Sequence, residues 1–183
     1  MIKNEHTAID LKIILKAREE GLSLLKANVR AVTPPEQEIR TNMETFIQPA
    51  EAGVKRLLKV SQLNSSDLTP EHLRHFFGLG TKEEPEGIVG LEVFNTVALL
   101  RSLAVVSSRR GAGLGSNLLA HAEDYARALG ITSLYLLTNT AESFFKHRGY
   151  EITGRDDAPP AIRETKEFSV ICPVSSVLMV KHL

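Results

Sequence analysis

A glycine-rich turn is the part of the sequence whose residue types and spacing point most directly to chemistry. It reads Arg109-Arg110-Gly111-Ala112-Gly113-Leu114-Gly115-Ser116 and lies between an apolar segment and an amphipathic one. Because glycine lacks a Cβ, several backbone N–H groups can converge on one point and a ligand can come close to the chain. Where such a turn opens a helix, the unpaired N–H groups and the helix dipole favour an anion. We therefore interpret residues 109–116 as a cradle for a phosphate or pyrophosphate.

Three kinds of turn compete for this interpretation. A dinucleotide-binding turn has a glycine at the sixth position, where this chain has Ser116, and an acidic residue at the end of the next strand, where it has Thr138-Asn139. A mononucleotide P-loop needs a Gly-Lys-Ser/Thr sequence, and the turn contains no lysine. The remaining alternative from the residues themselves is a tight strand-to-helix connection with incidental glycines.

The segment Arg110-x-x-Gly113-x-Gly115 matches the Arg/Gln-x-x-Gly-x-Gly/Ala pattern of the GNAT superfamily of N-acetyltransferases, and its surroundings resemble that family too. The pattern follows an expected strand that ends in Ala104-Val105, opens a helix, and is followed by a strand, a short helix and Gly149-Tyr150. In that family the segment holds the pyrophosphate of acetyl-CoA. The resemblance implies an α/β fold with a mixed, mostly antiparallel central sheet, a parallel splayed pair of strands and helices on both faces.

The resemblance also implies how the cosubstrate is held and used. The pantetheine arm is expected between the splayed strands, and a neutral amine attacks the thioester directly while a backbone N–H near Val105 polarises its carbonyl. Preorganised donors and the positioning of the two reactants would supply most of the rate enhancement. The expected acetyl-CoA contacts are Leu103, Ala104, Val105, Arg110, Gly111, Ala112, Gly113, Leu114, Gly115, Ser116 and Phe145.

Acid–base roles are assigned less directly. Glu92, on the strand expected beside the central one, is a candidate general base, either directly or through water. The alternatives are a solvated carboxylate or an ion pair with Arg101 across the hairpin. Many family members carry a tyrosine that acts as the general acid, and this chain has Phe145 at that position, so the general acid stays unassigned.

The C-terminal half has a closer resemblance, to the arsenic-resistance N-acetyltransferase branch. The matching segments are Leu100-Arg101-Ser102-Leu103-Ala104-Val105, Tyr135-Leu136-Leu137-Thr138, Thr140-Ala141-Glu142-Ser143-Phe144-Phe145, Ala161-Ile162-Arg163, Glu167-Phe168, Cys172-Pro173 and Ser175. A related branch acetylates an organoarsenical amino acid, whose anionic groups would need cations. Arg101 or Arg163 would serve for such an acceptor, and a structural or surface arginine is the alternative for each.

Composition narrows the class of protein. The chain has 183 residues, of which 43% are hydrophobic, so one domain with a sizeable core is expected. Lys+Arg and Asp+Glu are both 22, which gives no reason to expect a nucleic-acid or membrane partner. One cysteine fits a reducing compartment, so we expect a cytoplasmic protein. The six histidines show no metal-ligand spacing, so we expect no metal.

Periodicity divides the chain at about residue 44. Residues 1–44 read as an N-terminal helical extension, interpreted either as a dimerisation element, which would make a homodimer, or as a lid; a packed arm is the favoured alternative. Residues 45–183 form the expected acetyltransferase domain. Its expected strands are 46–47, 76–79, 88–94, 99–106, 133–137, 151–153 and 176–181, and its expected helices are 50–63, 114–129, 140–147 and 161–168.

The sequence therefore predicts an enzyme that moves an acetyl group from acetyl-CoA to the amine of a small molecule. Two alternatives remain open. One is a protein or peptide N-acetyltransferase, which needs an open acceptor groove. The other is a non-catalytic acyl-CoA-binding module, in which Phe145 marks a lost general acid.

Overall fold

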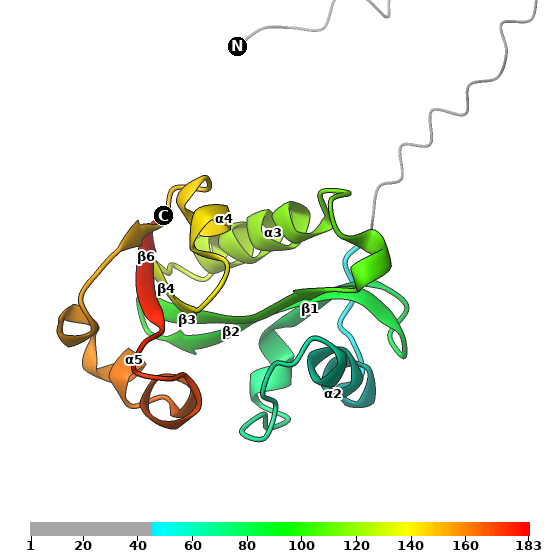
Figure 1. Ribbon diagram of the computed structural model, residues 1–183, viewed down its shortest axis with the longest axis horizontal. Helices are drawn as coiled ribbons and strands as arrows, with labels where there is room; N and C mark the ends of the chain where they lie inside the picture. The colour runs from blue at the N-terminus through cyan, green and yellow to red at the C-terminus, as the bar shows by residue number, and fades with distance from the viewer. Residues whose placement is uncertain (1–44) are drawn as a thin grey trace, which may run out of the picture. The chain divides into compact units, whose positions relative to one another are not determined.

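The structure is a computed structural model that describes residues 45–183 (Figure 1). The helical extension predicted over residues 1–44, with its dimerisation, lid and packed-arm interpretations, lies outside the described residues. Among residues 45–183, no helix combines the length and the apolar character needed to cross a bilayer.

A six-stranded sheet forms the middle of the described part, with the strand order β1-β2-β3-β4-β6-β5. Only β3 and β4 run parallel, and every other neighbouring pair is antiparallel. The strands are β1 Phe76–Gly80, β2 Pro85–Phe94, β3 Val97–Val105, β4 Ser133–Thr138, β5 Glu151–Ile152 and β6 Val177–His182. This mixed, mostly antiparallel sheet confirms the expected fold class.

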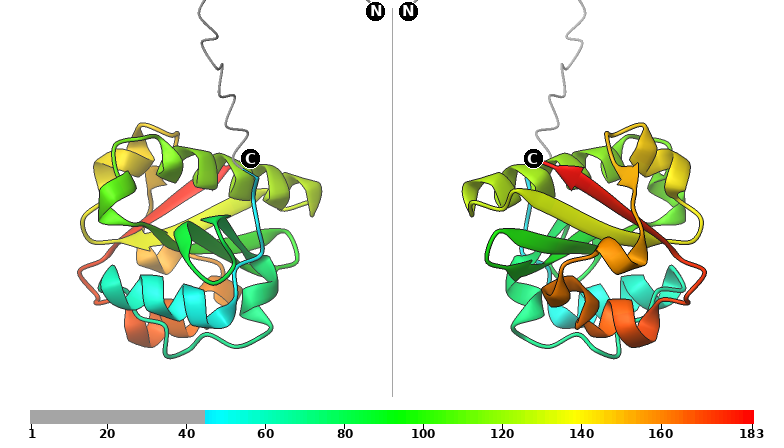
Figure 2. Two further views of the ribbon diagram at one scale, coloured as in Figure 1. Left: turned by 90° about the vertical axis from the view of Figure 1, so that its right-hand side faces the viewer. Right: turned by 90° about the vertical axis from the view of Figure 1, so that its left-hand side faces the viewer.

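Helices cover both faces of the sheet, as expected. Helices α3 (Leu114–Ala128) and α4 (Glu142–Lys146) lie on one face, and α2 (Glu51–Val60) and α5 (Pro160–Arg163) lie on the other (Figures 1 and 2). Three short 3₁₀ turns, η1 (His72–His75), η2 (Ser107–Arg109) and η3 (Arg155–Asp157), and one π-helix, η4 (Glu167–Ile171), complete the described elements. The apolar stripe that predicts α3 is its buried face: Leu114, Leu118, Leu119, Ala122 and Ala126.

The parallel pair separates partway along its length. Residue pairing between β3 and β4 covers Val97–Ser133, Ala98–Leu134 and Leu99–Tyr135 and goes no further, although β3 continues to Val105 and β4 to Thr138. Beyond Leu99, the edge of β3 that faces β4 therefore has no strand partner within the described chain. We call this opening between the two strands the gap.

A β-bulge in β3 turns its side chains at the gap. Ile88 pairs with Ala104 and Gly90 with Arg101, so β3 carries one more residue than β2 here, and Ser102 has a φ of 59°. An extra residue inverts the alternation of side chains along a strand. In a regular strand Leu99, Leu103 and Val105 would share one face, because even numbers of residues separate them. With the bulge, Leu99 packs on the α5 face, whereas Leu103 and Val105 pack with the core cluster under α3.

Two expected elements are different in the structure. Instead of a strand at 46–47 there is a single bridge between Ile47 and Gly78. Instead of one helix over 161–168, α5 ends at Arg163 and a separate π-helix begins at Glu167. The break occurs because the Thr165 hydroxyl donates to the carbonyl of Ile162 and accepts the N–H of Phe168, which replaces regular helical hydrogen bonds.

Aromatic rings hold the start of the described chain against α3. Phe46 stacks on His121 with ring centroids 3.8 Å apart, and Phe77 meets the same histidine edge-on at 4.7 Å. Nearby, His75 Nδ1 lies 2.9 Å from the Tyr125 hydroxyl. The stack joins the connection at 46 to the edge of the sheet.

We expect the stability of the protein to fall as the pH drops below about 6.5 because of these two histidines. Burial lowers the pKa of His121, against a smaller opposing effect of Asp124, from the ordinary value of 6.5. Burial and then the charge of Arg74 lower the pKa of His75, with Glu71 opposing. The unfolded chain then binds more protons than the folded one, so stability is present above pH 6.5 and is lost below it. Thermal unfolding measured between about pH 5 and 8, the range in which histidines titrate, gives the slope of stability against pH. This slope should be smaller in the variant His121→Phe. An unchanged slope in that variant would contradict the assignment.

Candidate functional site

A pocket of about 610 Å³ lies where the gap meets the start of α3. Its walls are the end of β3, the glycine-rich turn, the first turn of α3, and α4 with the residues just before it. The lining residues are Leu103, Val105, Arg109, Arg110, Gly111, Gly113, Leu114, Gly115, Ser116, Thr140, Ala141, Phe144, Phe145 and Arg148.

The glycine-rich turn has the geometry that the sequence predicts for a cradle. Gly111 and Gly113 have φ values of +80° and +87°, a region that residues with a Cβ rarely adopt. Gly113 is the N-cap of α3, and its carbonyl accepts the N–H of Ser116 and of Asn117. A Cβ built on either glycine would meet no protein atom within 4 Å. The backbone of the turn therefore faces open space at a helix N-terminus, which suits an anionic ligand.

Two arginines of the turn have defined positions. Arg110 is exposed, and its Nε donates to the carbonyl of Val105 at 3.1 Å, so its side chain folds back over the end of β3. Arg109 forms an ion pair with Glu86, with 3.2 Å between Nη1 and Oε2. Arg110 is thus the cation of the turn that stands beside the gap.

Arg148 supplies a third cation, which was not predicted from the sequence. Its guanidinium lies over the ring of Phe144 at 3.6 Å, donates to the Phe144 carbonyl at 2.7 Å and also donates to the Ser116 hydroxyl on α3. These contacts use two of the five N–H donors of an arginine. Its contact with Phe144 could have been predicted from spacing. Arg148 follows Phe144 by four residues, the separation at which side chains share a helix face.

Most of the residues predicted to contact acetyl-CoA line this pocket, and two do not. Ala104 is 6% exposed and packs with the cluster beneath α2, on the other face of the sheet, because the bulge shifts the alternation. Ala112 is an exposed residue of the turn that lies outside the lining. Phe145 lines the pocket from α4.

Within the described residues, no tyrosine, histidine or carboxylate lines the pocket. Tyr150, near the expected position of the general acid, is 2% exposed and packs on Phe145 with ring centroids 5.5 Å apart. Burial raises the pKa of its hydroxyl, and Glu123 adds to the shift. The pocket itself thus offers cations, backbone groups and apolar surface.

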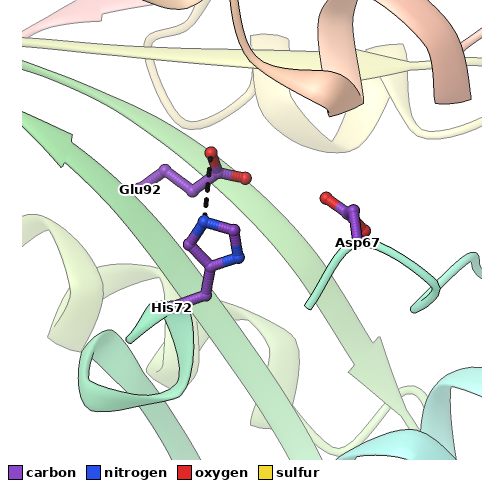
Figure 3. A group of neighbouring side chains, drawn as sticks. All are labelled: Asp67, His72 and Glu92. Carbon is purple, nitrogen blue, oxygen red and sulfur yellow. Dashed lines mark ion pairs between the residues drawn. The ribbon is translucent and has the colours of Figure 1, made fainter. Parts of the chain in front are cut away.

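Glu92 and Arg101 lie on the opposite face of the sheet, in a buried ion-pair network. Arg101 binds Glu92, which is the ion pair considered above, and it also binds both carboxylate oxygens of Asp67 at 2.6 and 2.9 Å and Glu167 at 2.8 Å. Figure 3 shows Asp67, His72 and Glu92 pointing toward one another. Asp67 comes from the loop between α2 and η1, His72 from η1 and Glu92 from β2. His72 Nε2 lies 3.9 Å from Glu92 Oε2. We call Arg101, Asp67, Glu92 and Glu167 the Arg101 network.

The charges of this network shift its carboxylates in opposite directions. Burial works to raise the pKa of Asp67, but the hydrogen bonds and charge of Arg101 outweigh it, so that pKa lies below its ordinary value. Burial raises the pKa of Glu167 more than Arg101 lowers it. Asp67, His72 and Glu92 bring atoms of the kind that bind metal ions within 4.8 Å of one another. Arg101, however, already supplies a positive charge to the two carboxylates of this group.

Arg163, a candidate acceptor residue, and Cys172, the single cysteine, are found near this face. Arg163 is exposed at the end of α5. Cys172 is half-buried, and its thiol donates to Glu167 Oε1 with Sγ 3.4 Å away. Burial, followed by the charge of Glu167, raises the pKa of that thiol to about 12, so the thiol stays protonated at neutral pH.

Comparison with known proteins agrees with this geometry. The model of the acetyltransferase (GNAT) family matches residues 41–150. An uncharacterised N-acetyltransferase of Chlorobaculum tepidum is 34% identical over 116 residues, which are 62% of this chain and 74% of that protein. An amino-acid acetyltransferase of Pseudomonas syringae pv. syringae is 42% identical over 62 residues, 34% of this chain and only 14% of the relative's length.

Among solved structures, the N-acetylglutamate synthase of Neisseria gonorrhoeae, complexed with coenzyme A and N-acetyl-glutamate, superposes with a TM-score of 0.63 at 23% identity. The superposition covers 76% of this chain and 35% of that one. At this identity the likeness concerns the fold.

Proposed function

The chain belongs to the acetyltransferase (GNAT) family, and from this membership we propose that it transfers an acetyl group from acetyl-CoA to the amine of a small molecule. The observation that carries the proposal is the pocket at the gap. In this pocket the glycine-rich N-terminus of α3 lies next to the unpaired edge of β3. One ligand can therefore place an anionic group at the helix N-terminus and an extended arm along the strand edge.

The residues of the pocket fit acetyl-CoA in both charge and shape. The turn from Arg110 to Ser116 would hold the pyrophosphate, with Arg148 as an additional cation on the facing wall. The pantetheine arm would extend beside Leu103 and Val105, whose side of β3 is open because β4 diverges after Tyr135. Phe144 and Phe145 would pack against its apolar part.

Acetyl-CoA supplies an activated thioester, and the chain supplies orientation, polarisation and proton removal. The backbone N–H near Val105 would polarise the thioester carbonyl, since a fixed donor costs no reorganisation when charge develops. Glu92 is the carboxylate we propose for taking the proton from the amine through water, and it lies on the far face of the sheet.

The proposed acceptor class is an amine that also carries an anionic group, as in an amino acid. The name of the Pseudomonas relative and the sequence resemblance to the arsenic-resistance branch both favour this class. Arg163, exposed on α5, is the proposed cation for the acceptor's anionic group. Arg101 has three carboxylate partners of its own, so we propose another role for it below.

The test is release of CoA thiol from acetyl-CoA across a panel of amino acids, amine antibiotics and arsenic-containing amino acids. Turnover on one amino acid supports the proposal, and preference for an arsenic-containing one supports the branch assignment. CoA binding without turnover on any small amine would overturn the small-molecule proposal. It would favour a protein acceptor or a non-catalytic acyl-CoA-binding module, for which Phe145 in place of the usual tyrosine is the supporting feature.

Replacing Arg148 should weaken CoA binding without unfolding the protein. Arg148→Met keeps packing against Phe144 but removes the cation and its bond to Ser116. Since hydrogen bonds to charged groups contribute about 1.5–3 kcal/mol, we expect the Kd to rise at least about tenfold. The matched control is Lys146→Met, because Lys146 lies on the same helix, pairs with Glu142 and does not line the pocket. Calorimetric titration with CoA measures both, and equal Kd values would remove Arg148 from the site.

A further inference from the structure

The Arg101 network joins three separate parts of the chain to the central strand. Arg101 stands on β3, Glu92 on the neighbouring β2, Asp67 in the loop 61–71 between α2 and η1, and Glu167 on η4 within the segment 164–176. Both terminal nitrogens of Arg101 are used twice. Nη1 reaches Asp67 and Glu92, and Nη2 reaches Asp67 and Glu167. One guanidinium therefore connects a loop and a π-helix that have no sequence proximity.

The network lies directly behind the gap. Arg101 is two residues beyond Leu99, the last residue of β3 that pairs with β4. It precedes the bulge, so it shares the face of Leu99, which packs with Ile162 and Phe168. The pocket lies on the α3 side of the same strand, just past the bulge. The two faces of β3 thus carry the cosubstrate pocket and the Arg101 network within a few residues of each other.

We propose that Arg101 is a positioning residue for the acceptor side of the reaction: it holds the loop 61–71 and the segment 164–176 over the far side of the gap. The inference rests on the proposed function, because it assigns these two segments as walls of the path by which the amine reaches the thioester. Arg101 would act by holding these segments in place and would not itself touch the acceptor. Direct contact with the acceptor is left to exposed side chains.

Arginine suits this role better than any other side chain. Its planar guanidinium binds one carboxylate with two parallel bonds and keeps donors for others, whereas lysine offers one compact ammonium. Arg101 has a side chain 1% exposed, and the Asp67 and Glu92 side chains are 3% and 7% exposed, so solvent does not screen these bonds. Removing the guanidinium would leave three carboxylates facing one another, and like charges in a buried place repel.

Hydrogen exchange of the full chain, followed by mass spectrometry, tests the proposal without an acceptor. In Arg101→Met we expect faster exchange in both 61–71 and 164–176, while α3 and the turn 109–116 keep their protection. If Arg101→Met does not fold, Glu167→Gln replaces it, because Glu167 is the most exposed member of the network at 18%. That variant should loosen 164–176 alone. Arg127→Met is the matched control, an arginine on α3 that pairs with Asp124 and Glu123 outside the network, and it should change neither segment.

Kinetics then separate positioning from a purely structural role. With the best amine from the acceptor panel, Arg101→Met or Glu167→Gln should raise the acceptor KM about tenfold while the acetyl-CoA KM stays within about twofold. Unchanged exchange in both segments, or an equal rise in both KM values, would overturn the proposal. Failure of the wild-type protein to bind CoA would instead overturn the proposed function, and the exchange result would still show whether Arg101 holds the two segments.

Discussion

Gly113→Val is expected to abolish CoA binding while the protein stays folded. Gly113 has a φ of +87° and forms the N-cap of α3, so valine there strains the backbone and places two methyl groups over the convergent N–H groups. No protein atom lies within 4 Å of the new Cβ, so valine there would fill open space that we propose for the pyrophosphate. Calorimetry should show a Kd raised by at least about a hundredfold, since a close backbone contact with phosphate is lost.

Gly130→Val provides a closely matched control for that experiment. Gly130 has a φ of +78°, has no protein atom within 4 Å of a built Cβ, and follows the other end of α3, away from the pocket. Both variants should lose a similar amount of stability, about 1–2 kcal/mol for a non-glycine residue in this region. Only Gly113→Val should lose CoA. Equal loss of CoA binding in both variants, or in neither, would contradict the cradle assignment.

Gly90→Ala is expected to be the most destabilising small substitution in the sheet. A Cβ at Gly90 would lie 2.3 Å from the ring of Phe76, which pairs with it across β1 and β2 and is fully buried. Because the ring has no exposed direction in which to move, strand or ring must shift, which costs about 1–3 kcal/mol. Urea denaturation should measure this loss. Gly115→Ala is the control, since its nearest neighbour, Phe144 Cζ, is at 3.7 Å, an ordinary contact. A loss equal to that of the control would show that the sheet adjusts freely.

Local patterns predicted the glycine-rich turn and the helix that follows it well. The glycine spacing indicated the turn at 109–116, and the apolar period of the following residues indicated α3 and its buried face. The divergence of β3 and β4 followed from family resemblance, and pairing that ends at Leu99–Tyr135 confirms it. The sequence 101–103 carries no proline or glycine that would announce a bulge. The bulge places Ala104 against α2 and Leu103 in the pocket, and this placement is decided by tertiary packing.

The Arg101 network was harder to predict because its contacts are long-range. The pair of Glu92 and Arg101 was within reach of sequence reasoning, since the two residues lie on neighbouring strands of one hairpin. Asp67, 34 residues before Arg101, and Glu167, on a π-helix, carry no local signal that links them to β3. The helix expected at 161–168 fails for the same kind of reason, since the side chain of Thr165 takes over backbone hydrogen bonds.

The most direct test of the central claim is a calorimetric titration of the wild-type protein with acetyl-CoA, repeated with ADP as competitor. If the turn 109–116 holds a pyrophosphate, acetyl-CoA should bind at one site per chain, and ADP, which carries the pyrophosphate without the pantetheine arm, should compete for it. Absence of binding, or binding that ADP leaves unchanged, would contradict the assignment of the pocket.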